Sequence, residues 1–248
     1  MKPQRHDRLL HALARPAAAA TLLCVAGMAW ASDLHFGGSA AVTSDYVFRG
    51  VTQSRNRQVA QLDLHFRPLE DWTVGAWASQ VELLPGRRTA EVNLYTQWRW
   101  LLARDFSASA GAVHYVFPGD PRSVSYRYTE LNAGLRWRER LALNATWAPR
   151  VALFSPVYRV QRDRRTWSAD LSATQPMPGG FVALAGIGYF DAPGLAHAGY
   201  AYGSASLLRR FGRWRAELTY FHVQSAGHRS FTSGAAGGPL TARLAWQF

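Results

Sequence analysis

The chain has 248 residues, a formal net charge of +12, 48% hydrophobic residues and a single cysteine, Cys24. One cysteine excludes a disulfide framework, and after the first 31 residues no apolar run approaches the roughly 20 residues that a membrane-spanning helix needs. A basic chain would suit nucleic-acid binding, but most arginines are scattered along alternating segments, with one dense group at 162–165, and the N-terminus carries an export signal. We therefore expect no nucleic-acid partner.

Residues 1–31 have the pattern of a secretory signal peptide. The basic residues at its start are Lys2, Arg5, Arg8 and Arg15. An apolar run follows from Ala17 to Ala29, and Ala29 and Ala31 are small residues where signal peptidase requires them. The run is too short for a transmembrane anchor. We therefore predict cleavage before Ser32 and one mature domain over residues 32–248.

The first predicted strand covers residues 34–49, where apolar and polar residues alternate. From Phe36 to Tyr46 it would extend about 33 Å, which at the tilt of a barrel strand rises about 25 Å, the height of the apolar band of an outer-membrane barrel. We therefore expect Tyr46 and Phe48 to face lipid at the outer interface. Asp45 and Arg49 would face inward as a charged pair. This pair would either filter solutes or pin the barrel wall, and we favour pinning.

The same alternation continues to the end of the chain and predicts twelve strands. They cover about 34–49, 58–67, 71–82, 89–100, 105–117, 124–138, 140–153, 165–175, 180–191, 199–210, 213–224 and 239–248. Short connections alternate with mostly longer ones, which is typical of periplasmic turns and extracellular loops. The fold class is therefore all-β, a transmembrane antiparallel up-and-down β-barrel in the bacterial outer membrane.

One face of the predicted strands carries charges of both signs. The candidate lumen and selectivity residues are Asp45, Arg49, Asp63, Arg67, Glu91, Arg99, Glu130, Arg136, Asp170, Arg215, Glu217 and Arg243. A soluble sandwich or lipocalin would have to bury such a face, which is costly, whereas a wet lumen accommodates it. Arginines in the lumen would favour anions if the pore is open. Alternatively, the same charges would form a ladder of salt bridges that fills a small barrel.

The last predicted strand carries a second export feature. Leu240, Ala242, Leu244, Trp246 and Phe248 share one face, and the strand ends on an aromatic residue. This end is similar to the signal that the outer-membrane barrel assembly machinery recognises. We therefore expect Trp246 and Phe248 to form the assembly signal and the machinery to be a partner.

The segment from Thr43 to Ser54, Thr-Ser-Asp-Tyr-Val-Phe-Arg-Gly-Val-Thr-Gln-Ser, resembles the N-terminal signature of the TorF family, a group of proteobacterial outer-membrane proteins classed as porins. The stretches 115–119, 128–130 and 180–181 and the terminal Phe248 also fit the family. The resemblance implies a passive outer-membrane channel, and it identifies neither a solute nor a catalytic residue.

Residues for other chemistry are sparse. An outer-membrane lipid hydrolase would need a serine and a histidine together, and only His222 and Ser225 come close in sequence. No cluster has the spacing of metal ligands, so we expect neither catalysis nor a cofactor. The dense basic group Arg162, Arg164 and Arg165 falls in a predicted loop and suits lipopolysaccharide phosphates.

We therefore expect a channel for passive diffusion of small polar or anionic solutes, with outer-membrane lipids and lipopolysaccharide as surroundings. The alternatives are a non-conducting structural or adhesion barrel and a lipid-modifying hydrolase.

Overall fold

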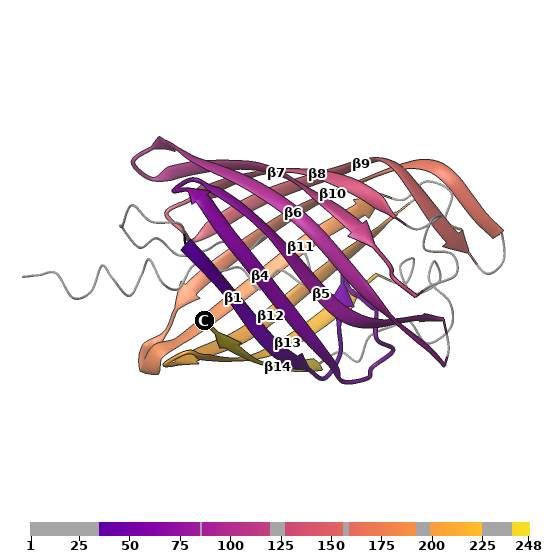
Figure 1. The fold of residues 1–248 in the computed structure, drawn as a ribbon. Coiled ribbons are helices and arrows are strands. Elements are labelled where there is room, and N and C mark those ends of the chain that lie inside the picture. Colours follow the sequence, from indigo (N-terminus) through magenta and orange to yellow (C-terminus); the bar gives the residue numbers. More distant parts are fainter. Residues whose placement is uncertain (1–34, 85, 120–126, 156–158, 192–198, 225–239) are drawn as a thin grey trace, which may run out of the picture.

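Twelve antiparallel strands close into a barrel in the computed structural model (Figure 1). The structure describes residues 35–84, 86–119, 127–155, 159–191, 199–224 and 240–248. The predicted fold class and strand number are confirmed. The predicted signal segment and its cleavage point before Ser32 lie outside the described residues.

The strands of the wall follow one another in chain order around the barrel. They are β1 (His35–Thr43), β4 (Val59–Leu69), β5 (Trp72–Leu84), β6 (Arg87–Ala103), β7 (Phe106–Val116), β8 (Tyr128–Trp137), β9 (Leu141–Ser155), β10 (Arg159–Pro176), β11 (Phe181–Asp191), β12 (Tyr200–Phe211), β13 (Trp214–Val223) and β14 (Leu240–Gln247). A 3₁₀ turn, η1 (Pro178–Gly180), joins β10 to β11. Two further short strands, β2 (Val47–Phe48) and β3 (Val51–Thr52), pair only with each other.

The short connections from β4 to β5, β6 to β7, β8 to β9, β10 to β11 and β12 to β13 lie at one end of the barrel, together with His35 and Phe248 (Figure 1). We call it the turn end and its opposite the loop end. Tryptophans gather at the turn-end termini of the strands, and Trp98, Trp214 and Trp246 are exposed there. Aromatic rings of this kind suit a membrane interface.

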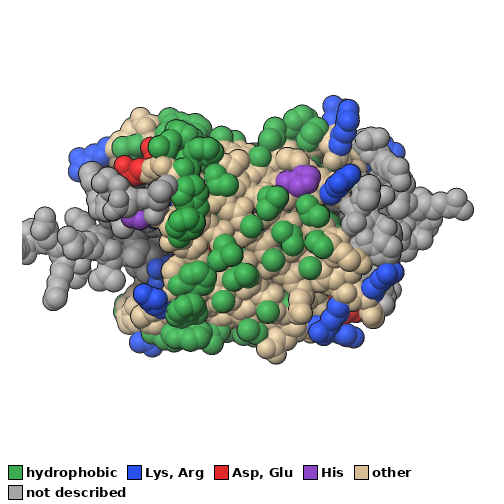
Figure 2. Space-filling model, viewed as in Figure 1, with side chains coloured by type: hydrophobic (Ala, Val, Ile, Leu, Met, Phe, Trp, Pro, Cys, Tyr) green, Lys and Arg blue, Asp and Glu red, His purple; other side chains and the backbone are tan. Residues whose placement is uncertain are grey.

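The wall separates an apolar outside from a polar inside, because successive strand residues point to opposite faces. In β4, Leu62 and Leu64 are 43% and 49% exposed, whereas Asp63 between them is 6% exposed. Figure 2 shows hydrophobic side chains over the outer face of the barrel, densest in a band near the turn end, with arginines toward both ends.

Strand residues occupy parts of two predicted loops. In the predicted loop at 83–88, β5 continues to Leu84 and β6 begins at Arg87, and in the one at 154–164, β9 continues to Ser155 and β10 begins at Arg159. The strands extend because antiparallel pairing continues, for example between Phe154 and Val160, and satisfies backbone groups that a loop would leave to water. Arg162, Arg164 and Arg165 therefore belong to β10, and their placement in a loop was wrong.

The first strand is the other correction. It ends at Thr43 and not near residue 49, and the chain then turns into the barrel as the β2–β3 hairpin before it rejoins the wall at Val59. We call residues 44–58 the inner hairpin.

The barrel closes where β1 meets β14, and closure removes every free strand edge of the wall. At this seam the amide of Gly38 donates to the carbonyl of Phe248 (3.0 Å), and the amide of Phe248 donates to the carbonyl of Gly38 (3.1 Å). The Phe248 ring lies over Gly38, within 2.8 Å of where a Cβ would be, and stacks beside Trp246 at 5.0 Å. Gly38 therefore leaves space that the terminal ring fills.

We expect Gly38→Val to weaken the seam by about 1–3 kcal/mol, because the added side chain would overlap the Phe248 ring and the carbonyl of Asp63. The urea midpoint of the refolded barrel and the fraction that migrates as folded on unheated gels would fall. Ala40→Val is the control, since Ala40 lies exposed on the outer face of the same strand. Equal stability of the two variants would contradict this account of the seam.

Candidate functional site

The inner hairpin is built around a two-residue turn. Phe48 pairs with Val51, and the turn residues Arg49 and Gly50 have φ values of 49° and 78°. Two positive φ angles define the type I′ turn that β-hairpins prefer. Glycine suits this conformation, whereas a non-glycine residue such as Arg49 is strained there by about 1 kcal/mol or more. The contacts of the Arg49 side chain with the barrel wall, described below, offset this strain.

Asp45 organises the base of the inner hairpin. Its Oδ1 accepts hydrogen bonds from the hydroxyls of Thr52 (2.5 Å) and Ser54 (2.6 Å) and from the backbone amide of Asn56 (3.2 Å). Burial raises the pKa of Asp45 above its ordinary value, and these hydrogen bonds act in the opposite direction. One carboxylate thus ties both arms of the hairpin together.

Arg49 carries the tip of the hairpin to the opposite wall. Its Nη1 and Nη2 donate to the two carboxylate oxygens of Glu130 on β8, at 2.9 and 3.0 Å, and Nη2 also donates to Thr146 on β9 at 2.9 Å. The guanidinium lies over the rings of Phe48 and Phe190, 4.6 and 4.7 Å from their centroids. Arg49 and Glu130 are each 2% exposed. An arginine that binds a carboxylate through two hydrogen bonds, stacks on aromatic rings and is shielded from water is held firmly in place.

The hairpin also touches the wall on either side of this ion pair. A Cβ added at Gly50 would lie 3.0 Å from Cβ of Tyr202 on β12 and 3.1 Å from Cβ of Val223 on β13. At the other end the amide of Glu82 on β5 donates to the carbonyl of Gln53 (2.7 Å). The inner hairpin therefore crosses the lumen from β5 to β12 and β13.

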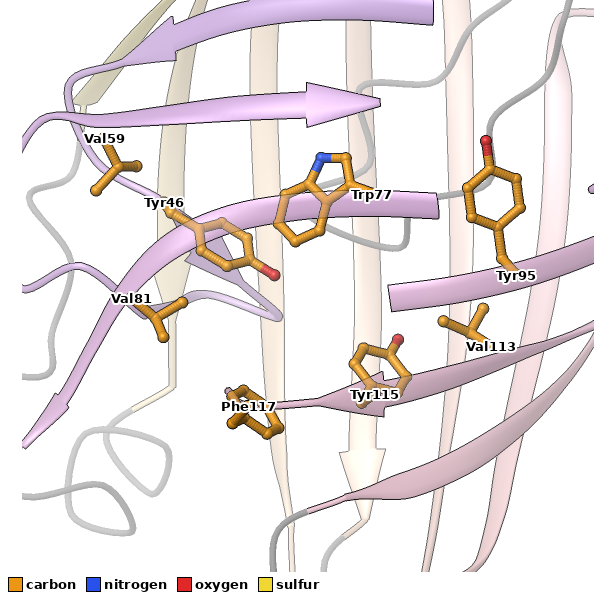
Figure 3. Packing of buried hydrophobic residues seen from close by; sticks show 8 residues of the cluster. All are labelled: Tyr46, Val59, Trp77, Val81, Tyr95, Val113, Tyr115 and Phe117. Carbon is orange, nitrogen blue, oxygen red and sulfur yellow. The ribbon is translucent and has the colours of Figure 1, made fainter. Parts of the chain in front are cut away.

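Tyr46 and Phe48 were predicted to face lipid, and this is wrong because their segment leaves the wall at Thr43. Tyr46 is 4% exposed, packs edge-on against Trp77 with ring centroids 5.2 Å apart, and donates a hydrogen bond to Glu91 (3.2 Å). Figure 3 shows the cluster around it, which joins the hairpin to β5, β6 and β7. Its members are Tyr46, Val59, Trp77, Val81, Tyr95, Val113, Tyr115 and Phe117.

Two tyrosines in the lumen lie on glycines of the neighbouring strand. Tyr95 covers Gly75 and donates to Asp63 Oδ2 (2.9 Å), and Tyr202 covers Gly188 and donates to Asp170. Without a Cβ beneath them the rings lie along the wall, so their hydroxyls reach the carboxylates.

The predicted lumen residues divide into two places. Asp45 and Arg49 lie on the inner hairpin, and they do not form the predicted pair, since Arg49 binds Glu130 instead. The others share the parity of the buried positions in their strands: Asp63, Arg67, Glu91, Arg99, Glu130, Arg136, Asp170, Arg215, Glu217 and Arg243. Of the remaining predicted residues, the structure joins Arg215 to Glu217 (2.8 Å), whereas Arg136 binds Glu139 (2.7 Å) and Arg243 binds Gln61 (3.2 Å).

Most acidic and basic residues of the lumen, Glu217 apart, occupy different levels. The carboxylates of Asp63, Glu91, Glu130 and Asp170 lie along the middle of their strands or toward the loop end, among the contacts of the hairpin and the tyrosines. Arg67, Arg99, Arg136, Arg215 and Arg243 lie nearer the turn end, where Glu217 is bound to Arg215. The hairpin brings bases to the acidic carboxylates: Arg49 binds Glu130, and Arg57 binds Glu82 at 3.2 Å.

Sequence reasoning missed Thr146, Phe190 and Tyr202, because they contact the site only through a segment that was predicted to be part of a strand. The available signal was the dipeptide Arg49-Gly50 between Val47-Phe48 and Val51-Thr52, pairs of β-branched and aromatic residues at a spacing that permits a tight hairpin.

Other candidate chemistry is not assembled in the described part of the chain. No group of three or more metal-binding side chains occurs within it. The described residues also contain no helix long and apolar enough to cross a membrane. His222 lies exposed on the outer face of β13, and Ser225, the serine nearest to it in sequence, is outside the described residues.

The closed wall, apolar outside and charged inside, defines an antiparallel β-barrel with the polarity of a membrane-spanning barrel. Residues 28–233 match the family described as "Bacterial protein of unknown function (Gcw_chp)", and the chain belongs to this family. The match bears a different name from TorF, so that resemblance stays a prediction. No curated protein matches the sequence.

Solved structures of similar fold include outer-membrane porins. The NanC porin aligns with a TM-score of 0.53 and 10% identity, over 86% of this chain and 99% of its own. The KdgM porin gives 0.51 and 8%, over 86% and 98%. An outer-membrane channel from Pseudomonas putida F1 gives 0.50 and 11%, over 89% and 97%. At these identities the similarity concerns the fold alone.

We expect Arg49→Ala to destabilise the folded barrel by about 3–5 kcal/mol, because it leaves the Glu130 carboxylate buried without its counter-charge. Urea unfolding of the refolded protein measures the loss. Glu130→Gln in the Arg49→Ala background should restore part of it by removing the stranded charge.

Arg138→Ala is the matched control, since Arg138 pairs with Asp105 at 3.0 Å on the exposed turn end and such pairs contribute at most about 1 kcal/mol. Similar losses in Arg49→Ala and Arg138→Ala would show that the hairpin contact is not a buried ion pair in solution.

Proposed function

We propose that this protein is an outer-membrane channel for passive diffusion of small polar or anionic solutes, and that the inner hairpin closes it in the conformation described. The apolar outer face supports a membrane location, and the charged inner face supports an aqueous path. Porins with the same fold support the same class of function. We place the turn end toward the periplasm, because the short turns of outer-membrane barrels lie on that side.

The observation that carries the proposal is the inner hairpin itself. It is joined to the wall at Thr43 and Val59 and meets the far wall chiefly through Arg49 and Gly50. A solute can pass this level only if the tip moves away from Glu130. The Arg49–Glu130 pair then acts as a latch, and its strength sets how often the channel opens.

Anionic solutes are the finer part of the proposal, and the arginines near the turn end support it. Arg67, Arg99 and Arg136 project from alternate strands β4, β6 and β8 on the inner face. Cationic rings favour anions in pores.

A non-conducting structural barrel is the second candidate. The observation that favours it is the satisfaction of the hairpin, whose base, tip and aromatic flank all have partners in the wall. A latch that never releases would leave a stable, silent barrel.

Single-channel recording in a planar bilayer decides between the two. We expect wild-type protein to show small or infrequent steps, and Arg49→Ala to show larger or more frequent steps, because the hairpin tip loses its contacts to β8 and β9. Arg138→Ala, on the exposed turn, should behave as wild type.

In a salt gradient the reversal potential of the open state should indicate anion preference, weakened in Arg243→Ala. Silence of both the wild type and Arg49→Ala, with folding verified by gel migration, would favour the structural barrel. A cation-directed reversal potential would remove the anionic part of the proposal.

The Thr43–Ser54 signature supports membership of the TorF porins.

An outer-membrane location also implies two partners. The aromatic pair Trp246 and Phe248 supports recognition by the barrel assembly machinery. Arg164 and Arg165 are exposed near the loop end of β10 and suit the phosphates of lipopolysaccharide, the second partner. Replacing Arg162, Arg164 and Arg165 by glutamine should weaken binding of purified lipopolysaccharide, and unchanged binding would exclude this contact.

A further inference from the structure

On the turn-end side of the hairpin, the inner face of β7 carries only small residues. These are Ser107, Ser109 and Gly111, all partly exposed. The strand register sets Gln97 and Arg99 of β6 beside Gly111 and Ser109, and Asn132 and Arg136 of β8 beside Gly111 and Ser107. Long polar side chains of β6 and β8 therefore flank a floor of small ones on β7.

Two amides above this floor have unused hydrogen-bonding capacity. Where a Cβ of Gly111 would be, Gln97 Oε1 lies 2.7 Å away and Asn132 Oδ1 lies 3.1 Å away, so both amides lie over the glycine. Gln97 Nε2 and Asn132 Oδ1 are buried without a hydrogen-bond partner among the described residues, and Asn132 is only 7% exposed. Buried polar groups are ordinarily paired, so the unpaired donor Gln97 Nε2 indicates a site for a polar molecule that accepts a hydrogen bond. The Asn132 oxygen is itself an acceptor and takes no part in that site.

Arg99 adds positive charge that its neighbours do not balance. Its side chain makes no hydrogen bond or ion pair within the described part of the chain, and the charges that act on it are those of Arg136, Arg67, Glu139 and Asp71. Glu139 is already bound by Arg136 at 2.7 Å. The group therefore contains three arginines and two acids, and one of these acids, Glu139, already binds Arg136.

We infer that Arg99, Arg136 and Gln97 form a binding site for a small oxyanion, a carboxylate or phosphate group, seated over Ser109 beside the Gln97 amide. A guanidinium presents donors in the geometry of such oxyanions, and an amide nitrogen adds another donor. The hairpin above restricts the site to small ligands that enter from the turn end. The inference names the solute class of the proposed channel and rests on that function for its purpose, whereas binding itself needs no conduction.

Binding is measured on refolded protein in a non-ionic detergent by calorimetric titration with inorganic phosphate and, separately, with succinate, at constant ionic strength. We expect saturable binding of at least one anion. Arg99→Gln should weaken it about tenfold to a hundredfold, the loss typical of a charged hydrogen-bonding partner. Arg138→Gln, which removes the same charge from the exposed turn, should leave it unchanged.

Ser109→Val is a second variant that alters no charge and fills the floor, and it too should weaken binding, so the inference does not depend on the folding of Arg99→Gln alone. Absence of saturable binding, or binding that both variants leave unchanged, would overturn the inference. Anion binding by a barrel that is silent in the bilayer would support this site while the channel function fails. Conduction without anion binding would support the channel function and overturn the anion site.

Discussion

The guanidinium of Arg49 forms an ion pair with the carboxylate of Glu130 inside the barrel. The position of the inner hairpin in the lumen depends on this pair. Removing two charges from water costs several kcal/mol per ion, which is offset only where hydrogen bonds and dipoles surround both. Here Thr146 and the rings of Phe48 and Phe190 complete the surroundings. Because these groups come from three different elements, the pair fixes the hairpin tip against the far wall.

Other carboxylates of the interior have different partners. Glu91, Asp63 and Asp170 accept hydrogen bonds from tyrosine hydroxyls, and Asp63 also pairs with His65. The arginines are displaced toward the turn end, so the sign of the fixed charge changes along the barrel axis. An ion that enters from the turn end therefore meets a mouth richer in arginines than in acids and then an acidic middle, where Arg49 of the inner hairpin is bound to Glu130.

The strands of the wall could be predicted because one physical rule governs them: each must present apolar residues to one side and polar residues to the other. The same rule failed at residues 44–49. Tyr46 and Phe48 alternate with Val47 and Arg49 just as strand residues do, and an aromatic ring is as well buried against Trp77 as against lipid.

The segment could continue as a wall strand or turn into the barrel as a hairpin. The positive φ angles of Arg49 and Gly50 distinguish the hairpin from the strand. The partners of Arg49 were likewise beyond prediction, since they depend on which strands face each other across the lumen. The inward parity of Glu130 was visible in its strand, but its distance from Arg49 was not.

The contacts of the latch join residues far apart in the chain: Arg49 and Glu130 are separated by 81 positions, and Arg49 and Thr146 by 97. Contacts of such high sequence separation form slowly, since the chain must first lose the entropy of closing the intervening loop. Interactions that are absent from the folding transition state act on the rate of unfolding and hardly on the rate of folding. By this argument the ion pair of the inner hairpin, like the β1–β14 seam, affects how long the closed barrel lasts once made more than how fast the local hairpins of the wall form.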